Sequence, residues 1–209
     1  MRVAAIVLAA GEGRRLGGPK ALVRLREATF ASAAAACFER ADVAARVVVL
    51  GAHAERVATG AGLPPGVSLV VNARWAEGML TSVWAGLDWA GPLGMDAVLL
   101  HPVDNPLVAE ATVTAVLEAL KQGAIIAVPS HGGCRGHPAG FARAAWPALR
   151  AAALDGGARS VLAQRPEWVV HVPAGPDCLV DIDTPEALAA ARAALSSEDR
   201  KLAVAVRPR

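Results

Sequence analysis

Residues 8–20 hold the first group of side chains that could do chemistry, and they read Leu-Ala-Ala-Gly-Glu-Gly-Arg-Arg-Leu-Gly-Gly-Pro-Lys. The four glycines allow backbone N–H groups to approach a polyphosphate closely, while Arg15 and Lys20 add positive charge. The loop lacks the Gly-Lys-Ser/Thr ending of a Walker A motif, and Gly17 is out of place for a dinucleotide fingerprint. The segment predicts a phosphate-binding loop, with an ordinary surface turn as the alternative.

Acidic side chains form the second group. Asp104 lies in the segment His-Pro-Val-Asp-Asn-Pro, where two prolines fix the local backbone, and Asp181 and Asp183 lie in Asp-Ile-Asp-Thr-Pro-Glu. Carboxylates gathered at one place repel each other unless a cation lies between them, so we predict that all three bind Mg²⁺, or Mn²⁺ in its place. Capping of the following helix is the alternative at each segment.

Buried strands must position these groups. Val3–Ala9 is a continuous apolar run that ends at the glycine-rich loop, as expected of a strand buried on both faces. Further strands are predicted at 46–51, 67–71, 96–100, 124–128, 168–172 and 179–182, and helices at 31–41, 53–59, 80–89, 109–121, 141–153, 158–163 and 185–195, with a loop at 130–140. This alternation predicts an α/β fold of three layers with a mostly parallel central sheet.

The phosphate loop and both acidic segments each follow a predicted strand. Ligands of such sheets bind beyond the carboxyl ends of the strands, so the three segments should meet there. A phosphate-binding loop with a lysine, facing carboxylates that bind Mg²⁺, is what metal-assisted nucleotidyl transfer requires, because no protein nucleophile is needed.

Composition limits the other possibilities. The 209 residues, 54% hydrophobic and 19% charged, suit one domain, which we place at residues 1–195 with a polar tail at 196–209. A net charge of +2 with scattered arginines argues against nucleic-acid binding, and no apolar run is long enough to cross a membrane. Three cysteines form neither a CxxC pair nor an even disulfide set, which favours a reduced, cytoplasmic protein.

Five ordered motifs together resemble the MobA-like NTP transferases, and most closely the molybdenum cofactor cytidylyltransferases. The resemblance extends over residues 3–195. The motifs are L-A-A-G-x-x-x-R-x-G-x-x-K at Leu8–Lys20, E-G-M-x-x-S at Glu77–Ser82, P-x-D-x-P-L at Pro102–Leu107, G-H-P at Gly136–Pro138 and D-I-D-T-P-E at Asp181–Glu186.

The resemblance implies a Rossmann-like nucleotidyltransferase fold that couples an NTP to a phosphorylated acceptor and releases pyrophosphate. L-A-A-G at the loop is typical of members that use CTP, and the acceptor would be the molybdopterin form of the cofactor. Lys20, Arg15 and Asp104 would act in catalysis. The nucleotide would also contact the residues around the loop and the start of the 80–89 helix: Leu8, Ala9, Ala10, Gly11, Gly13, Gly78 and Ser82.

Several alternatives stay open at this point. The acceptor could be another phosphorylated compound, such as a sugar phosphate, a polyol phosphate or a phospholactate-like acid. The chain could also be a non-catalytic nucleotide-binding partner of a molybdoenzyme, although such a partner need not retain all three acids. His101, His137 and Arg159 could contact a phosphate; the alternatives are loop histidines bonded to the backbone and a solvated arginine, and for Arg159 the solvated role is favoured.

Overall fold

A computed structural model describes the backbone of residues 1–205 and the side chains of residues 1–196. Its main sheet has the strand order β10-β7-β9-β6-β1-β4-β5, with β8 paired to β7. The strands are β1 (Val3–Ala9), β4 (Ala45–Leu50), β5 (Val67–Val71), β6 (Ala97–Pro102), β7 (Ile126–His131), β8 (Cys134–Arg135), β9 (Ala139–Ala142) and β10 (Val169–Pro173). A separate hairpin pairs β2 (Arg24–Leu25) with β3 (Ala28–Thr29).

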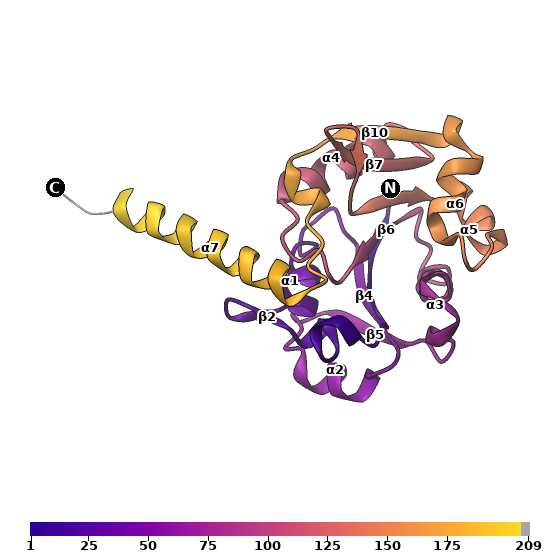
Figure 1. The fold of residues 1–209 in the computed structure, drawn as a ribbon. Coiled ribbons are helices and arrows are strands. Elements are labelled where there is room, and N and C mark those ends of the chain that lie inside the picture. Colours follow the sequence, from indigo (N-terminus) through magenta and orange to yellow (C-terminus); the bar gives the residue numbers. More distant parts are fainter. Residues whose placement is uncertain (206–209) are drawn as a thin grey trace.

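Helices cover both faces of this sheet (Figure 1). They are α1 (Phe30–Ala36), α2 (Ala54–Gly60), α3 (Met79–Ala90), α4 (Glu110–Lys121), α5 (Trp146–Ala151), α6 (Gly157–Gln164) and α7 (Pro185–Ala205). None of the helices within residues 1–205 is both long enough and apolar enough to span a bilayer.

Strand β1 is the centre of the fold because it contributes to both cores. All seven of its residues are buried, and it pairs in parallel with β4 on one side and β6 on the other. Val3, Ala5 and Val7 face the core under α1 and α4, whereas Ala4 and Ile6 face the core under α3, α5 and α6. This alternation confirms the predicted three layers and mostly parallel sheet.

Strand β9 corrects the prediction for residues 130–153. A loop was expected to residue 140 and a helix from 141, but Ala139–Ala142 forms an antiparallel strand between β6 and β7. A Cβ at Gly140 would lie 2.8 Å from Leu120 Cδ1 and 2.9 Å from Val116 Cγ1, so only glycine lets α4 pack this closely. A four-residue strand with a glycine at its centre carries little β-strand pattern, which is why the sequence did not indicate it.

Three other boundaries differ from the prediction. Helix α1 ends at Ala36 instead of residue 41. Residues 179–182 form no strand, because Leu179 ends a 3₁₀ turn, η6 (Pro176–Leu179), and residues 180–182 follow it without regular structure. The helix expected to end at residue 195 continues as α7 to Ala205, through much of the segment predicted as a polar tail. The rest of that predicted tail, residues 206–209, lies outside the described residues.

Candidate active site

The phosphate loop and the Asp104 segment leave the sheet side by side. Parallel pairing places Leu8 of β1 opposite Pro102 of β6, and Val103 N then donates to Leu8 O at 3.1 Å. The third segment joins through its backbone, because Ile182 N donates to Asp104 O at 2.8 Å. The three predicted segments therefore meet at the carboxyl edge of the sheet, as the sequence indicated.

The glycine-rich loop folds back on itself at Gly13. This residue has φ 70°, and a Cβ there would overlap Gly18 O, so the turn requires glycine. Gly13 O accepts hydrogen bonds from Leu16 N at 3.0 Å and Gly18 N at 3.3 Å. The turn is followed by a short 3₁₀ segment, η2 (Lys20–Leu22), which directs the Lys20 side chain towards the acids.

Ion pairs join Lys20 to acids that lie 84 and 163 residues away along the chain. The Lys20 ammonium donates to Asp104 Oδ2 at 2.6 Å and also to Asp183 Oδ1. Arg15 Nη2 lies 3.0 Å from the other oxygen of Asp183. We call these four residues the Lys20 cluster. The Lys20 and Asp104 side chains are 18% and 19% exposed, so their interaction is screened far less than one on the open surface.

The charges of the cluster shift its pKa values. Burial of the Lys20 ammonium favours the neutral form, but its hydrogen bonds to Asp104 and Asp183 outweigh this and raise the pKa. The hydrogen bond from Lys20 is also the main reason why the pKa of Asp183 is lowered. Asp181 takes no part in these ion pairs, and partial desolvation, with the charges of Asp104 and Asp183, raises its pKa. The cluster therefore favours a protonated Lys20 and an ionised Asp183.

The donor set fits a hard divalent cation held in part by a substrate. Within the side chains that the structure describes, no group of three or more His, Cys, Asp or Glu residues could hold a metal by itself. Asp104 and Asp183 nevertheless bring carboxylate oxygens to one place, around the Lys20 ammonium. Mg²⁺ is commonly bound by one or two carboxylates together with substrate phosphates, so these two acids suit it better than the predicted set of three.

Asn72 organises the neighbouring edge of the site and was missed in the sequence. It follows β5, is 6% exposed, and donates through Nδ2 to Thr81 Oγ1 at 2.7 Å and to Ser82 Oγ at 3.0 Å. Gly78, directly before α3, accepts from the Thr81 hydroxyl at 2.8 Å. Ser82 itself is buried, so its predicted contact with a nucleotide stays a prediction. The only sequence signal for this network was an asparagine directly after a predicted strand.

Two histidines lie beneath the Asp104 segment. His101, fully buried in β6, forms a hydrogen bond through Nε2 with Asn105 O at 2.8 Å, and burial, with the charge of His137, lowers its pKa to about 3. Burial likewise lowers the pKa of His137; the charge of Asp104 opposes this shift, and the charge of Arg159 adds to it. His101 thus fixes the turn that carries Asp104, while the predicted phosphate contacts of His137 and Arg159 remain untested.

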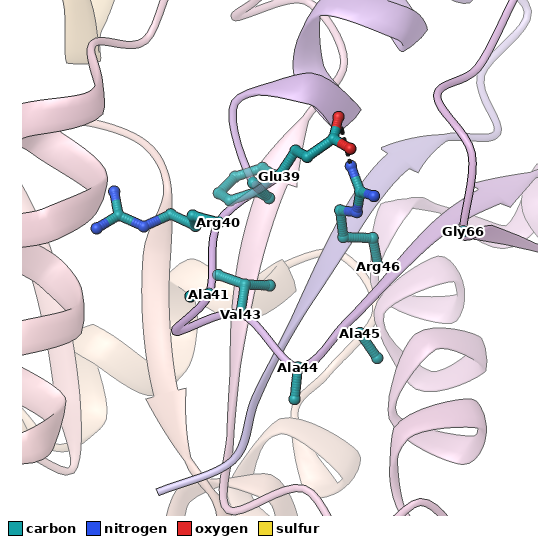
Figure 2. Close-up of a pocket in the computed structure, with 9 residues that line it drawn as sticks. Glu39, Arg40, Ala41, Val43, Ala44, Ala45, Arg46 and Gly66 are labelled. Carbon is teal, nitrogen blue, oxygen red and sulfur yellow. Dashed lines mark ion pairs between the residues drawn. The ribbon is translucent and has the colours of Figure 1, made fainter.

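Two hollows lie away from Lys20. One, of about 310 Å³, is beside the Asn72 network and is lined by Asn72, Arg74, Thr81, Trp84, Ala85, Asp88 and Arg150. The other, of about 390 Å³, is at the amino edge of the sheet, where Arg40 and Arg46 point into different directions around a floor of small residues (Figure 2). Neither is lined by a residue of the Lys20 cluster.

The fold and the Lys20 cluster together define an α/β nucleotidyltransferase. The chain belongs to the MobA-like NTP transferase family, whose domain matches residues 5–169. The matched range contains four of the five motifs, and the fifth, Asp181–Glu186, lies beyond it.

Named relatives differ in substrate. Over 178 residues, 81% of this chain and 85% of the relative, the chain is 35% identical to nicotine blue oxidoreductase from Paenarthrobacter nicotinovorans. It is 32% identical to molybdenum cofactor guanylyltransferase from Rhodobacter capsulatus, over 91% of this chain and 95% of that protein. It is 37% identical to 2-C-methyl-D-erythritol 4-phosphate cytidylyltransferase from Streptomyces avermitilis, over 62% of this chain and 54% of that protein.

Solved structures show the same fold. Rv0371c from Mycobacterium tuberculosis H37Rv superposes with a TM-score of 0.79 at 26% identity, over 92% of this chain and 98% of that one. The Mycobacterium tuberculosis protein has also been solved in complex with manganese. A nucleotidyl transferase from Methanothermobacter thermautotroptrophicus gives a TM-score of 0.79 at 24% identity, over 94% and 99% of the two chains.

Proposed function

We propose that the chain transfers a nucleotidyl group from an NTP, with CTP favoured, to a phosphorylated acceptor. The molybdopterin form of molybdenum cofactor is the first candidate acceptor, and a molybdoenzyme is a candidate partner. In this reaction a phosphate oxygen of the acceptor attacks the α-phosphorus of the NTP, and pyrophosphate leaves. The relatives named guanylyltransferase and cytidylyltransferase support transfer to a phosphorylated acceptor.

The observation that carries the proposal is the position of Lys20. Its ammonium lies at the end of the glycine-rich loop and is held between Asp104 and Asp183, with Arg15 beside it. Because the pKa of Lys20 is raised, it stays a cation at neutral pH and can bind phosphate oxygens. The backbone from Leu8 to Gly13 would lie along the nucleotide, and Lys20 and Arg15 would neutralise the charge that develops on the leaving pyrophosphate.

Asp104 and Asp183 would hold Mg²⁺ or Mn²⁺. The bound cation supplies charge neutralisation at the phosphate oxygens during in-line displacement. Asp181, the third predicted metal ligand, lies outside the Lys20 ion pairs, and its burial and the charges of Asp104 and Asp183 raise its pKa. The manganese complex of Rv0371c supports a divalent cation in proteins of this fold.

The preference for CTP comes from the L-A-A-G motif at Leu8–Gly11. It depends on the small side chains of Ala9 and Ala10, both 7% exposed, which leave backbone groups to recognise the base. The buried hydrogen bond from Asn72 to Ser82 would keep the start of α3 fixed next to that base. Competition binding between CTP and GTP tests this point, and tighter binding of GTP would overturn the preference without affecting the rest.

The test of the activity is pyrophosphate release with each of four NTPs and a panel of phosphorylated acceptors that includes molybdopterin. We expect release with one NTP and one acceptor, complete loss with EDTA, and recovery when Mg²⁺ or Mn²⁺ is added in excess. No release with any combination, from protein that is folded and metal-loaded, would overturn the proposal.

The relative named nicotine blue oxidoreductase supports a second candidate, an oxidoreductase activity on the same fold. None of the residues of the Lys20 cluster is itself redox-active, so this reaction would need a separate reductant such as a reduced nicotinamide dinucleotide. Oxidation of that dinucleotide with a dye substrate, unaffected by Lys20→Ala, would favour the second candidate. If the protein does not oxidise the dinucleotide in this assay, the result favours nucleotidyl transfer.

A further inference from the structure

The Lys20 ammonium occupies the place between two carboxylates that a divalent cation would need. It lies 2.6 Å from Asp104 Oδ2 and also bonds Asp183 Oδ1. Arg15 Nη2 lies 3.0 Å from Asp183 Oδ2, so both oxygens of Asp183 are already bonded to cationic side chains. A metal that enters this site must therefore displace bonds that the protein itself makes.

Displacing Lys20 has a cost that depends on what else is bound. Its side chain is 18% exposed, so an ammonium that lost both carboxylates would be poorly solvated and close to a divalent cation. The phosphates of a nucleotide would remove this penalty, because they offer Lys20 and Arg15 new anionic partners. The carboxylates would then be free for the metal.

We propose that Lys20 is a built-in competitor of the divalent cation at Asp104 and Asp183, and that the phosphates of a bound nucleotide release this competition. The nucleotide part of the inference rests on the proposed function, whereas the competition itself rests on the ion pairs alone. The metal alone then binds weakly, and metal and nucleotide each increase the binding affinity of the other. Such coupling is reciprocal, because each ligand raises the affinity of the other by the same factor.

The direct test is a titration of the full chain with Mn²⁺ in the absence of nucleotide. The electron paramagnetic resonance signal of the free ion measures how much Mn²⁺ is bound. Lys20→Met removes the competitor and should raise the Mn²⁺ affinity by about tenfold, within the range typical of coupled sites. Arg15→Met is the matched control, because it removes the same charge from the same cluster but frees only one oxygen of Asp183. It should raise the affinity by at most about threefold, the part due to charge alone.

The second measurement adds a non-hydrolysable NTP analogue, with CTP and GTP analogues in separate samples. In the wild type, the analogue should tighten Mn²⁺ binding by a larger factor than in Lys20→Met, because the variant has no competition left to release. Thermal midpoints show whether each variant is folded, and Lys20→Gln serves as a second variant if Lys20→Met is not.

The outcomes separate this inference from the proposed function. Unchanged Mn²⁺ affinity in folded Lys20→Met and Lys20→Gln would overturn the competition, even if the wild type releases pyrophosphate. An equal gain in Arg15→Met would also overturn it, since charge alone would then explain the effect. A gain in the Lys20 variants that clearly exceeds the gain in Arg15→Met supports the competition. If no analogue binds the wild type, the proposed function fails on its own.

Discussion

Cationic side chains meet acids at both edges of the sheet, but the two regions are built differently. At the amino edge, Arg40 Nε pairs with Asp42 Oδ1 at 2.6 Å, two residues along the chain, and Arg46 pairs with Glu39 at 3.4 Å (Figure 2). Arg46 also donates to Pro65 O at 2.9 Å. At the carboxyl edge, Lys20 pairs with acids that only the fold brings near it.

The two regions differ in what surrounds their charged side chains. The arginines of the amino edge are bonded to acids and carbonyls of neighbouring segments, so a ligand there would find few free groups. The Lys20 cluster instead concentrates two carboxylates and two cations next to a loop whose backbone can approach a phosphate. Variants of the two regions should therefore differ sharply in activity.

Asp104→Asn should have the largest effect. Loss of one metal-binding carboxylate should lower turnover by roughly 100- to 1,000-fold, the range found when a preorganised electrostatic contact is removed. The fold should persist, because Lys20 keeps its bond to Asp183. The measurement is pyrophosphate release, with Asp42→Asn of the amino edge as the matched control. Equal activity of Asp104→Asn and its control would show that the carboxyl edge is not the reaction site.

Lys20→Ala should have the second-largest effect on activity. We expect weaker NTP binding and a turnover lowered by about 100-fold. Because the ammonium bonds two partly buried carboxylates, stability should fall by about 1–3 kcal/mol. Lys121→Ala is the control, because Lys121 pairs with Glu118 and Asp42 on the surface. Nucleotide titration and thermal unfolding would separate the two effects.

His101 should make stability depend on pH. Burial holds its pKa at about 3 when folded, against 6.5 ordinarily, so below pH 6.5 the unfolded chain binds a proton that the folded chain does not. Stability should then fall by about 1.4 kcal/mol for each pH unit between those values. Denaturant unfolding at pH 7 and pH 5 measures the slope. His101→Gln should flatten it, whereas the control His171→Gln, at an exposed position, should not.

Arg46→Met should have the smallest effect. Its ion-pair partner Glu39 is 56% exposed and solvent screens the pair, so we expect a stability loss within about 1 kcal/mol and no change in pyrophosphate release. Thermal unfolding and the activity assay on one preparation would check both. A clear loss of nucleotide transfer in this variant would mean that the amino edge takes part in the reaction, and the contrast between the two regions would be wrong.

Strong local patterns were predictable from the sequence, and short elements were not. The apolar run of β1 and its glycine-rich ending predicted a buried strand followed by a loop, and both are present. β9 was missed because its four residues are defined by packing of Gly140 against α4. The strand expected at residues 179–182 is absent, because Ile182 bonds Asp104 O instead of joining the sheet.

The candidate site divides in the same way. Residue types and their positions after strands indicated Arg15, Lys20, Asp104 and Asp183, because parallel strands end at one edge. Asn72 carried no comparable signal, since a single asparagine after a strand is common in turns. Its role is visible only through its bonds to Thr81 and Ser82.

The sequence by itself determined the layered fold, the edge at which the phosphate loop and the acids gather, and the family to which they are similar. Apolar periodicity and glycine spacing are local properties of the sequence, so they can be recognised without knowledge of the tertiary contacts. Only the tertiary structure decided that Asp104 and Asp183 share the Lys20 ammonium while Asp181 stands apart. Lys20 lies 84 positions from Asp104 and 163 positions from Asp183 along the chain. Ion pairs over such separations depend on side-chain directions, which the packing of distant segments sets.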